Sequence, residues 1–207
     1  MKVVAHFFSI VFVPLLIPLF AALLIIWANP YAFGGEQAPE VVAFLYYVAL
    51  CTFIMPTVGL LMIKQLKLVE DLNLNDQRKR VVPYFLVISC YSIAFYMLNN
   101  LSIPTVVKAM MFGSLVSVII SFFWNNFLKV SAHANGMGSL IGVVIGLLFV
   151  STRNIEIVLV VLLLICGAVL SSRLYLGVHT LKEVSIGFIL GLVTQLLSFY
   201  LFFLMGI

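Results

Sequence analysis

Long apolar segments separated by short polar joints are the feature that most restricts how this chain can fold. Residues 3–27 contain no lysine, arginine, aspartate or glutamate, and similar segments recur to the C-terminus. Over the whole chain 64% of residues are hydrophobic and 9% are charged, whereas soluble domains carry about 25% charged residues. A soluble fold of this length could not cover its surface with polar groups. The chain is therefore predicted to be an integral membrane protein.

The length of the apolar segments predicts how often the chain crosses the membrane. A spanning helix needs about 20 apolar residues, because the hydrocarbon core is ~30 Å thick and a helix rises ~1.5 Å per residue. The fifth and sixth candidate spans are short and are joined only by STRN at 151–154. We predict an all-α fold, a polytopic transmembrane helix bundle of six or seven spans, in a single domain covering residues 1–207. The seven candidate spans are residues 3–27, 41–63, 83–101, 105–127, 136–151, 155–173 and 183–206.

Prolines and glycines inside the spans are expected to shape helices rather than end them. Pro14, Pro18 and Pro56 predict kinks, which neighbouring helices in a membrane tolerate. The run NGMGSLIGVVIG at 135–146 places glycines four residues apart on one helix face. This spacing predicts close packing against another helix.

Other classes of protein and site are disfavoured by the composition. The first apolar segment is longer than a signal-peptide core and lacks a convincing cleavage site, so it is expected to remain as a span. Cys51, Cys90 and Cys166 all lie inside apolar runs, so neither a disulfide nor a metal site is expected. The net charge of +4 forms no basic stripe between exposed aromatic residues, which argues against nucleic acid as a partner.

Seven spans would place most of the positive charge on one side of the membrane. That side holds the N-terminus and the joints 64–82, 128–135 and 172–182, and it carries nine of the eleven lysines and arginines. The opposite side carries only Lys108 and Arg153. By the positive-inside rule the charge bias favours the cytoplasm for the basic side. The nine basic residues are Lys2, Lys64, Lys67, Arg78, Lys79, Arg80, Lys129, Arg173 and Lys182.

Three polar clusters fall on this basic side: NLNDQRKRVVP at 73–83, KVSAHANG at 129–136 and SSRLYLGVHTLKEV at 171–184. Polar groups at the edge of a membrane core are costly, so their convergence indicates a functional site. In the third cluster His179 and Glu183 are four residues apart, so they would share a helix face. The carboxylate would fix the imidazole tautomer and leave the other ring nitrogen free as a nucleophile or base. Arg173 offers a planar fork of donors suited to phosphate.

The third cluster carries a family resemblance. Ser172, Arg173, five residues, His179, three residues and Glu183 resemble the third signature of the type 2 phosphatidic acid phosphatase superfamily, which includes lipid phosphate phosphatases and vanadium haloperoxidases. That signature reads Ser-Arg, five residues, His, three residues and Asp, so only the last residue differs. The resemblance implies an integral membrane member with a phosphatase-like helical core.

The other two signatures are matched less closely. The second, Pro-Ser-Gly-His, is similar to residues 130–133, which keep Ser131 and His133 but replace proline by valine and glycine by Ala132. The first is Lys, six residues, then Arg-Pro. The basic run 78–80 precedes Pro83 at about the right place, but no lysine–arginine pair has that spacing. The resemblance covers roughly residues 76–190.

The resemblance implies a metal-independent phosphatase that needs no cofactor and acts on lipid phosphates or pyrophosphates. His179 would attack phosphorus to form a phosphohistidine, oriented by Glu183, while His133 would protonate the leaving oxygen and later activate water. Membrane lipids would be its partners, and a bacterial cytoplasmic membrane its expected location. The phosphate-binding residues implied are Arg173, Ser131, Arg78, Lys79 and Arg80.

Two other functions remain open from the sequence. A homologue that binds a phospholipid head group without turnover would also keep these residues, and the replacements at Glu183 and Ala132 are compatible with it. A small membrane transporter would require ionisable residues in the middle of spans or an inverted repeat. Lys108 is the candidate nearest a span interior, and no internal repeat is evident. The identity of the lipid and the oligomeric state are not determined by the sequence.

Overall fold

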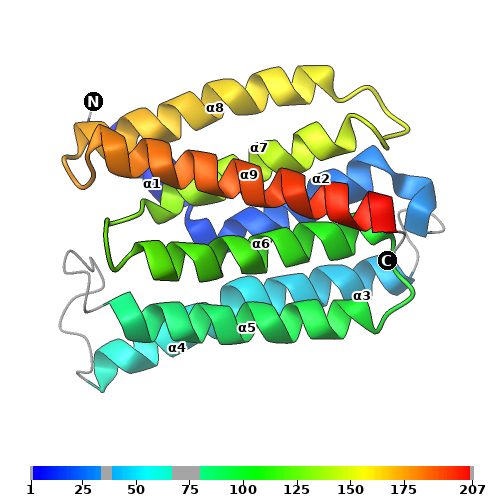
Figure 1. The fold of residues 1–207 in the computed structure, drawn as a ribbon, viewed down its shortest axis with the longest axis horizontal. Coiled ribbons are helices and arrows are strands. Elements are labelled where there is room, and N and C mark those ends of the chain that lie inside the picture. The colour runs from blue at the N-terminus through cyan, green and yellow to red at the C-terminus, as the bar shows by residue number, and fades with distance from the viewer. Residues whose placement is uncertain (1, 34–38, 67–79, 206–207) are drawn as a thin grey trace.

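The computed structural model describes residues 2–33, 39–66 and 80–205, and these residues form a bundle of α-helices that run in roughly the same direction or its reverse (Figure 1). Six helical segments are long and apolar enough to cross a membrane. This confirms the predicted all-α polytopic bundle. The helices are α1 (Lys2–Val11), α2 (Ile17–Ala28), α3 (Pro39–Val48), α4 (Met55–Gln65), α5 (Val81–Asn99), α6 (Thr105–Trp124), α7 (Ala132–Leu147), α8 (Glu156–Tyr175) and α9 (Leu181–Met205).

The first two helical rods, α1–α2 and α3–α4, are irregular near prolines, which the sequence predicted to kink helices rather than end them. The first rod breaks between α1 and α2, where a 3-10 turn covers Pro14–Leu16. In the second rod a π-helical stretch, Ala49–Ile54, links α3 to α4 directly before Pro56. The first prediction of a continuous helix over residues 3–27 therefore needs correction, because Pro14 cannot donate a backbone hydrogen bond to the preceding turn.

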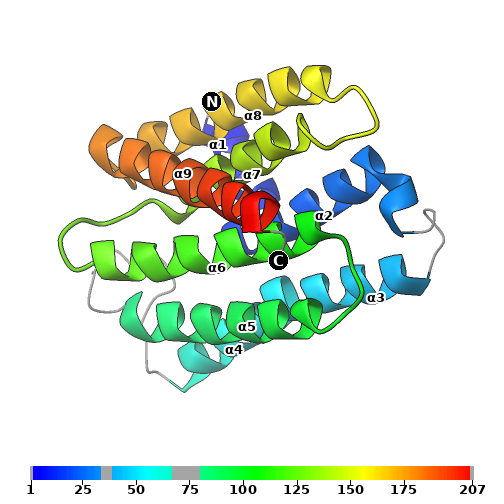
Figure 2. The same ribbon diagram turned by 45° about the vertical axis from the view of Figure 1, so that its right-hand side comes forward.

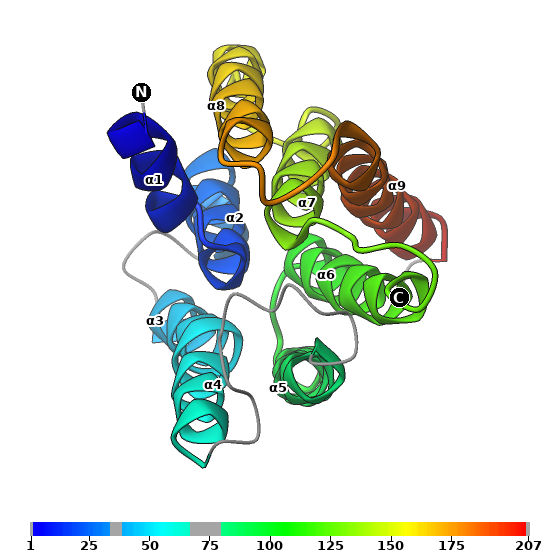
Figure 3. The same cartoon turned by 90° about the vertical axis from the view of Figure 1, so that its left-hand side faces the viewer.

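Helix α7 is shorter than the other spans. If α1–α2 and α3–α4 each count as one rod, α7 completes a bundle of seven rods among the described residues. Its 16 residues extend about 24 Å at 1.5 Å per residue. Twelve of the 16 are buried, because α7 lies between α2, α6, α8 and α9 (Figure 3). A helix surrounded by protein does not need the length of one that faces lipid on most sides. The helix begins at Ala132, four residues before the predicted start, so His133 lies on its first turn and not in a loop.

Glycines allow α7 and α9 to approach closely, as predicted from residues 135–146. Figures 1 and 2 show α9 lying across α6 and α7. A Cβ added at Gly138 or Gly191 would overlap the backbone of the facing helix, at Phe188 and Asn135 respectively. Backbone contact at this distance requires residues without side chains.

The basic joints meet at one end of the bundle. The start of α1, the end of α6 and the joint between α8 and α9 all lie at the left-hand end in Figure 1, which faces the viewer in Figure 3. Hydrogen bonds across this end join Arg80 to the Val130 carbonyl and Lys129 to the Val178 carbonyl. This arrangement brings the described parts of all three polar clusters together.

Candidate functional site

A cavity of about 620 Å³ opens at the basic end of the bundle. Its walls come from the break between α1 and α2 and from α4, α5, α6, α7 and the α8–α9 joint. Five basic side chains from three separate parts of the chain line it, so it is suited to an anion. These side chains are Arg80, Lys129, His133, Arg173 and His179.

The joint between α8 and α9 places Arg173 and His179 on the same cavity. Arg173 lies in the last turn of α8. Gly177 ends that helix with a φ of 65°, and its N–H donates to the Leu174 carbonyl at 3.0 Å. A glycine takes this left-handed conformation without a Cβ penalty, so the chain reverses direction within five residues. His179 lies in this joint, two residues before α9 begins at Leu181.

Glu183 holds His179 and also caps α9. The imidazole Nδ1–H donates to the Glu183 carboxylate at 2.9 Å. The Thr180 N–H donates to the same carboxylate oxygen at 3.1 Å, and the Glu183 N–H donates to the Thr180 hydroxyl at 3.3 Å. The last two bonds form a capping box, which the spacing Thr-x-x-Glu indicates. Since Nδ1 is occupied, Nε2 is the nitrogen of His179 that remains for chemistry.

The surroundings of His179 favour its neutral form. Burial lowers the pKa of His179 below its usual range, and the charges of Lys129 and Arg173 act in the same direction. The hydrogen bond to Glu183 opposes this lowering but does not outweigh it. A neutral imidazole has a lone pair on Nε2 at pH 7, which a nucleophile requires.

His133 faces the cavity from the first turn of α7, and Ser9 fixes its tautomer. Its Nε2–H donates to the Ser9 carbonyl at 3.0 Å, which leaves Nδ1 available. The carbonyl of Ser9 belongs to the last turn of α1, where helix carbonyls lack partners from the next turn. The break before Pro14 therefore supplies the acceptor that orients His133.

Ser9 also contacts Arg173, although its sequence context did not single it out. The Arg173 Nη1–H donates to the Ser9 hydroxyl at 3.1 Å. The Nε of Arg173 is buried and has no hydrogen-bond partner among the described residues. A buried, unused donor beside a cationic cavity is an observation that a bound anion would explain. Pro14 is the sequence feature that could have indicated a role for Ser9. A helix that ends before a proline leaves its last carbonyls without partners in a following turn.

Arg80 and Lys129 complete the cationic rim. The Arg80 Nη1–H donates to the Val130 carbonyl at 3.2 Å, and Lys129 Nζ donates to the Val178 carbonyl at 3.0 Å. Burial lowers the pKa of Lys129, and the nearby charge of Arg80 lowers it further. Lys129 was not predicted as a site residue. Arg78 and Lys79, which were predicted to bind phosphate, lie outside the described residues.

Ser131 connects the second and third clusters but is not among the residues that line the cavity. Its side chain is fully buried and its hydroxyl accepts a hydrogen bond from the Ala134 N–H at 3.4 Å, so it acts as the N-cap of α7. Its backbone N–H donates to the Glu183 carbonyl at 3.3 Å. The structure thus brings His133, His179 and Arg173 to one cavity and places Ser131 behind it.

A polar wall inside the bundle was missed by the sequence reading. Ser114, Ser117 and Ser121 lie on one face of α6, and Asn135 and Ser139 face them from α7; all five line the cavity. The spacing of the serines, three and then four residues, is the signal that could have found this wall.

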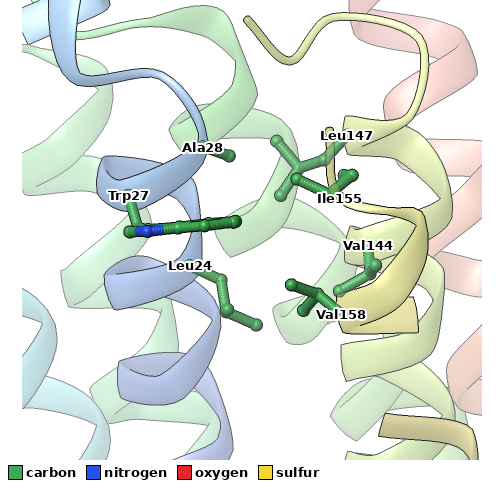
Figure 4. A pocket seen from close by; sticks show the side chains of 7 residues that line it. All are labelled: Leu24, Trp27, Ala28, Val144, Leu147, Ile155 and Val158. Carbon is green, nitrogen blue, oxygen red and sulfur yellow. The ribbon is translucent and has the colours of Figure 1, made fainter. Parts of the chain in front are cut away.

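A second recess lies at the opposite end of the bundle, between α2, α7 and α8. Figure 4 shows that Trp27 and six apolar side chains point into it. None of its seven lining residues is charged. Within the described ranges no three or more histidine, cysteine, aspartate or glutamate residues come together in a way that could hold a metal ion.

The sequence and the structure were compared with protein families, curated proteins and solved structures. No family model matches the chain, and neither a curated protein nor a solved structure shows significant similarity to it.

Proposed function

We propose that this integral membrane protein is a metal-independent phosphatase of the type 2 phosphatidic acid phosphatase kind, which hydrolyses lipid phosphates or pyrophosphates through a phosphohistidine. The observation that supports it most is the convergence of His179, His133 and Arg173 on one cationic cavity at the end of the bundle. The carboxylate of Glu183 holds His179 in the tautomer that attack on phosphorus needs.

In the first step, Nε2 of His179 attacks the terminal phosphorus as the bond to the leaving oxygen breaks. Since the imidazole carries positive charge after it forms the N–P bond, the Glu183 carboxylate stabilises the intermediate. The leaving oxygen takes a proton from Nδ1 of His133, which must be protonated at this point. The negative charge of the bound phosphate favours that protonated form.

In the second step, a water molecule attacks the phosphohistidine. Neutral His133 accepts the proton of this water at Nδ1, because its Nε2–H is committed to the Ser9 carbonyl. The N–P bond breaks, inorganic phosphate leaves, and His179 returns to its neutral form. Each step thus uses one nitrogen of each histidine, and the second nitrogen is held by the protein.

The cationic rim supplies the charge stabilisation. The phosphoryl oxygens carry negative charge in the transition state, and fixed donors aimed at them lower the barrier. Arg173 and Arg80 provide planar donors, and Lys129 adds a point charge near the same cavity. The unpartnered Nε of Arg173 is available for one of the phosphoryl oxygens.

The test is release of inorganic phosphate from a panel of lipid phosphates by the purified protein in detergent, with chelator present. We expect release that His179→Ala lowers at least a thousandfold and that vanadate blocks. Denatured protein from single-turnover reactions should carry acid-labile phosphate, and His179→Ala should carry none. Absence of release from every lipid, or equal release by His179→Ala, would refute the phosphatase. Tight binding of lipid phosphate without release would instead indicate a head-group-binding protein.

We further propose that the cavity faces the cytoplasm of a bacterial cell. Among the described residues six basic side chains lie at the cavity end, namely Lys2, Lys64, Arg80, Lys129, Arg173 and Lys182, and Lys108 and Arg153 lie toward the other end. The three native cysteines are buried. A Lys182→Cys variant in intact cells should therefore resist an impermeant maleimide and react only after lysis. Labelling of intact cells would reverse the assignment.

A further inference from the structure

The cavity continues into the bundle well below the cationic rim. Tyr91 lines it eleven residues after Arg80 on α5, which is about 16 Å at 1.5 Å per residue. Ser114 of α6 lines the cavity at the same depth. The end of α5 at Asn99 and the start of α6 at Thr105 lie at the same end of the bundle. Tyr91 is eight residues from the first of these points, and Ser114 is nine residues from the second. A single phosphate bound at the rim would leave this inner part unfilled.

The wall of α6 and α7 presents hydrogen-bond acceptors to the inner cavity. The Ser114 hydroxyl donates to the Met110 carbonyl at 2.9 Å, and the Ser139 hydroxyl donates to the Gly191 carbonyl at 3.4 Å. The Ser117 hydroxyl donates to Asn135 Oδ1 at 2.5 Å. Each of these hydroxyls has one hydrogen, which is used within the protein, so its remaining capacity is a lone pair. The wall is therefore suited to ligand groups that donate, such as hydroxyls.

Tyr91 on α5 supplies a further polar group to the inner cavity. The residue is only 4% exposed, and it lines the cavity. None of the residues that the structure describes forms a hydrogen bond with its hydroxyl. The hydroxyl is not among the fully buried polar atoms that lack a partner, so it is accessible from the cavity. This hydroxyl can donate to or accept from a group held in the cavity.

The rest of the inner wall is apolar. Val13, Ile17, Leu60, Val87 and Val118 line the cavity along with the polar side chains. A cavity lined by both polar and apolar side chains matches a group that carries hydroxyls as well as C–H bonds. The volume of about 620 Å³ is within the range of small-molecule sites, roughly 300–1,000 Å³, so it has room for such a group beside the phosphate.

We infer that the preferred substrates are phosphate monoesters of a polyhydroxylated alcohol, whose free hydroxyls enter the cavity between Tyr91 and Ser114 while the phosphate binds at the rim. This inference rests on the proposed phosphatase function and narrows its substrate class. The same chemistry occurs in a free polyol phosphate and in a lipid whose head group is a phosphorylated polyol. A phosphate attached directly to a hydrocarbon chain would place apolar groups against the serine lone pairs and the Tyr91 hydroxyl.

Helix packing alone does not account for Ser114. Ser117, Asn135 and Ser121 form a chain of bonds that joins α6 to α7, and Ser139 joins α7 to α9. Such bonds are common between membrane helices. Among the described residues Ser114 bonds only to a carbonyl of its own helix, and yet it lines the cavity. It is therefore the residue whose removal separates ligand recognition from packing.

The experiment compares four substrates in detergent: phosphatidylglycerophosphate, glycerol 1-phosphate, phosphatidic acid and farnesyl phosphate. We expect kcat/KM for phosphatidylglycerophosphate to exceed that for farnesyl phosphate at least tenfold. Ser114→Ala and Tyr91→Phe should each lower this ratio three- to tenfold without changing turnover of farnesyl phosphate, because each removes one hydrogen bond. A high rate on glycerol 1-phosphate would identify a free polyol phosphate as the source, and a low rate would identify the lipid.

Thr194→Val is the matched control. Thr194 is buried in α9, bonds to the Leu190 carbonyl of its own helix and does not line the cavity, so its loss should leave the ratio unchanged. Equal kcat/KM values for all substrates, or a ratio that Ser114→Ala and Tyr91→Phe leave intact, would overturn the inference while the phosphatase stands.

A binding measurement separates the two proposals. In His179→Ala, which cannot form the phosphohistidine, we expect glycerol 1-phosphate to bind at least threefold more tightly than inorganic phosphate by calorimetry. Adding Ser114→Ala or Tyr91→Phe should remove this difference. If no substrate is hydrolysed, the proposed function fails, and this binding ratio still decides whether the cavity recognises a polyol. Equal affinities would overturn the inference.

Discussion

Helix α7 presents two faces of opposite character. Toward α9 it has Gly138, Gly142 and Gly146, and a Cβ at any of them would meet backbone or side-chain atoms within about 3 Å. Toward α5 and the α1–α2 break it lines an open cavity with His133, Asn135 and other polar residues. The first face packs against α9 without a gap, and the second face borders a cavity.

Under the proposed function, this difference assigns stability to one face of α7 and substrate binding to the other. Tight contact between α7 and α9 fixes the position of α7 without help from lipid, so the other face does not need to close against its neighbours. A cavity inside a membrane bundle is otherwise costly, because unfilled space loses packing contacts. Substitutions on the two faces should consequently have distinct effects, on folding for one and on turnover for the other.

The largest expected effect is a loss of stability caused by a substitution on the face of α7 that packs against α9, called here the closed face. Gly138→Ala places a methyl group against the Phe188 backbone, so we expect unfolding to become easier by about 3 kcal/mol, with loss of monodisperse protein on heating in detergent. Gly167→Ala on α8 is the control, since nothing lies within 4 Å of its added Cβ. It should leave stability unchanged or slightly raised. Equal thermal stability of the two variants would contradict a closed face.

A change at Glu183 should lower turnover and leave the fold intact. Glu183→Gln keeps an oxygen for the capping box with Thr180 but removes the charge that stabilises the imidazolium of His179. We expect kcat to fall about tenfold, while the free energy of unfolding changes by less than about 0.5 kcal/mol. Glu183→Ala should cost a further ~1 kcal/mol of stability, because the cap is lost. Unchanged kcat in Glu183→Gln would remove this carboxylate from the mechanism.

Ser9 should influence substrate binding more than chemistry. Ser9→Ala removes the hydroxyl that holds Arg173 but keeps the carbonyl that holds His133. Loss of one hydrogen bond of about 1 kcal/mol predicts a KM about fivefold higher with kcat within twofold. Ser9→Thr should restore KM, since it returns the hydroxyl. A lower kcat at constant KM would show that Ser9 acts through His133 instead.

The smallest effect should be the pH dependence of stability. Because burial holds the pKa of His179 below its unfolded value of ~6.5, the unfolded chain binds more protons than the folded one at lower pH. The contribution of neutral His179 to the free energy of unfolding is present above about pH 6.5, and it is lost as the pH falls toward the pKa of the folded state. Between pH 7 and 5.5 the wild type should lose about 1 kcal/mol more than His179→Asn. Parallel pH profiles of the two proteins would contradict a lowered pKa.

Periodicity and composition were sufficient to predict the helices, because each membrane span must satisfy its own backbone hydrogen bonds. The predicted spans agree with the observed helices apart from their ends, the break at Pro14 and the early start of α7 at Ala132. The early start depends on the Ser131 cap and on packing that hides polar residues such as Asn135 from lipid. Neither is evident when hydropathy is read along a single segment.

The candidate site was predictable only in part. The spacing of Arg173, His179 and Glu183 identified one cluster, and the structure places all three beside each other at the α8–α9 joint. Ser9 and Lys129 were missed, because their roles depend on contacts with residues 49 to 164 positions away in the chain.

The sequence by itself determined that this chain is a membrane bundle of helices and that its basic joints fall on one side. The helix bundle follows from the length of the apolar segments. The side of the basic joints follows from the fact that successive spans cross the membrane in opposite directions. Only the tertiary structure decided which polar residues share a cavity, how deep that cavity is, and which nitrogen of each histidine remains free. These depend on the distances between helices, which packing at the glycines of α7 and α9 sets.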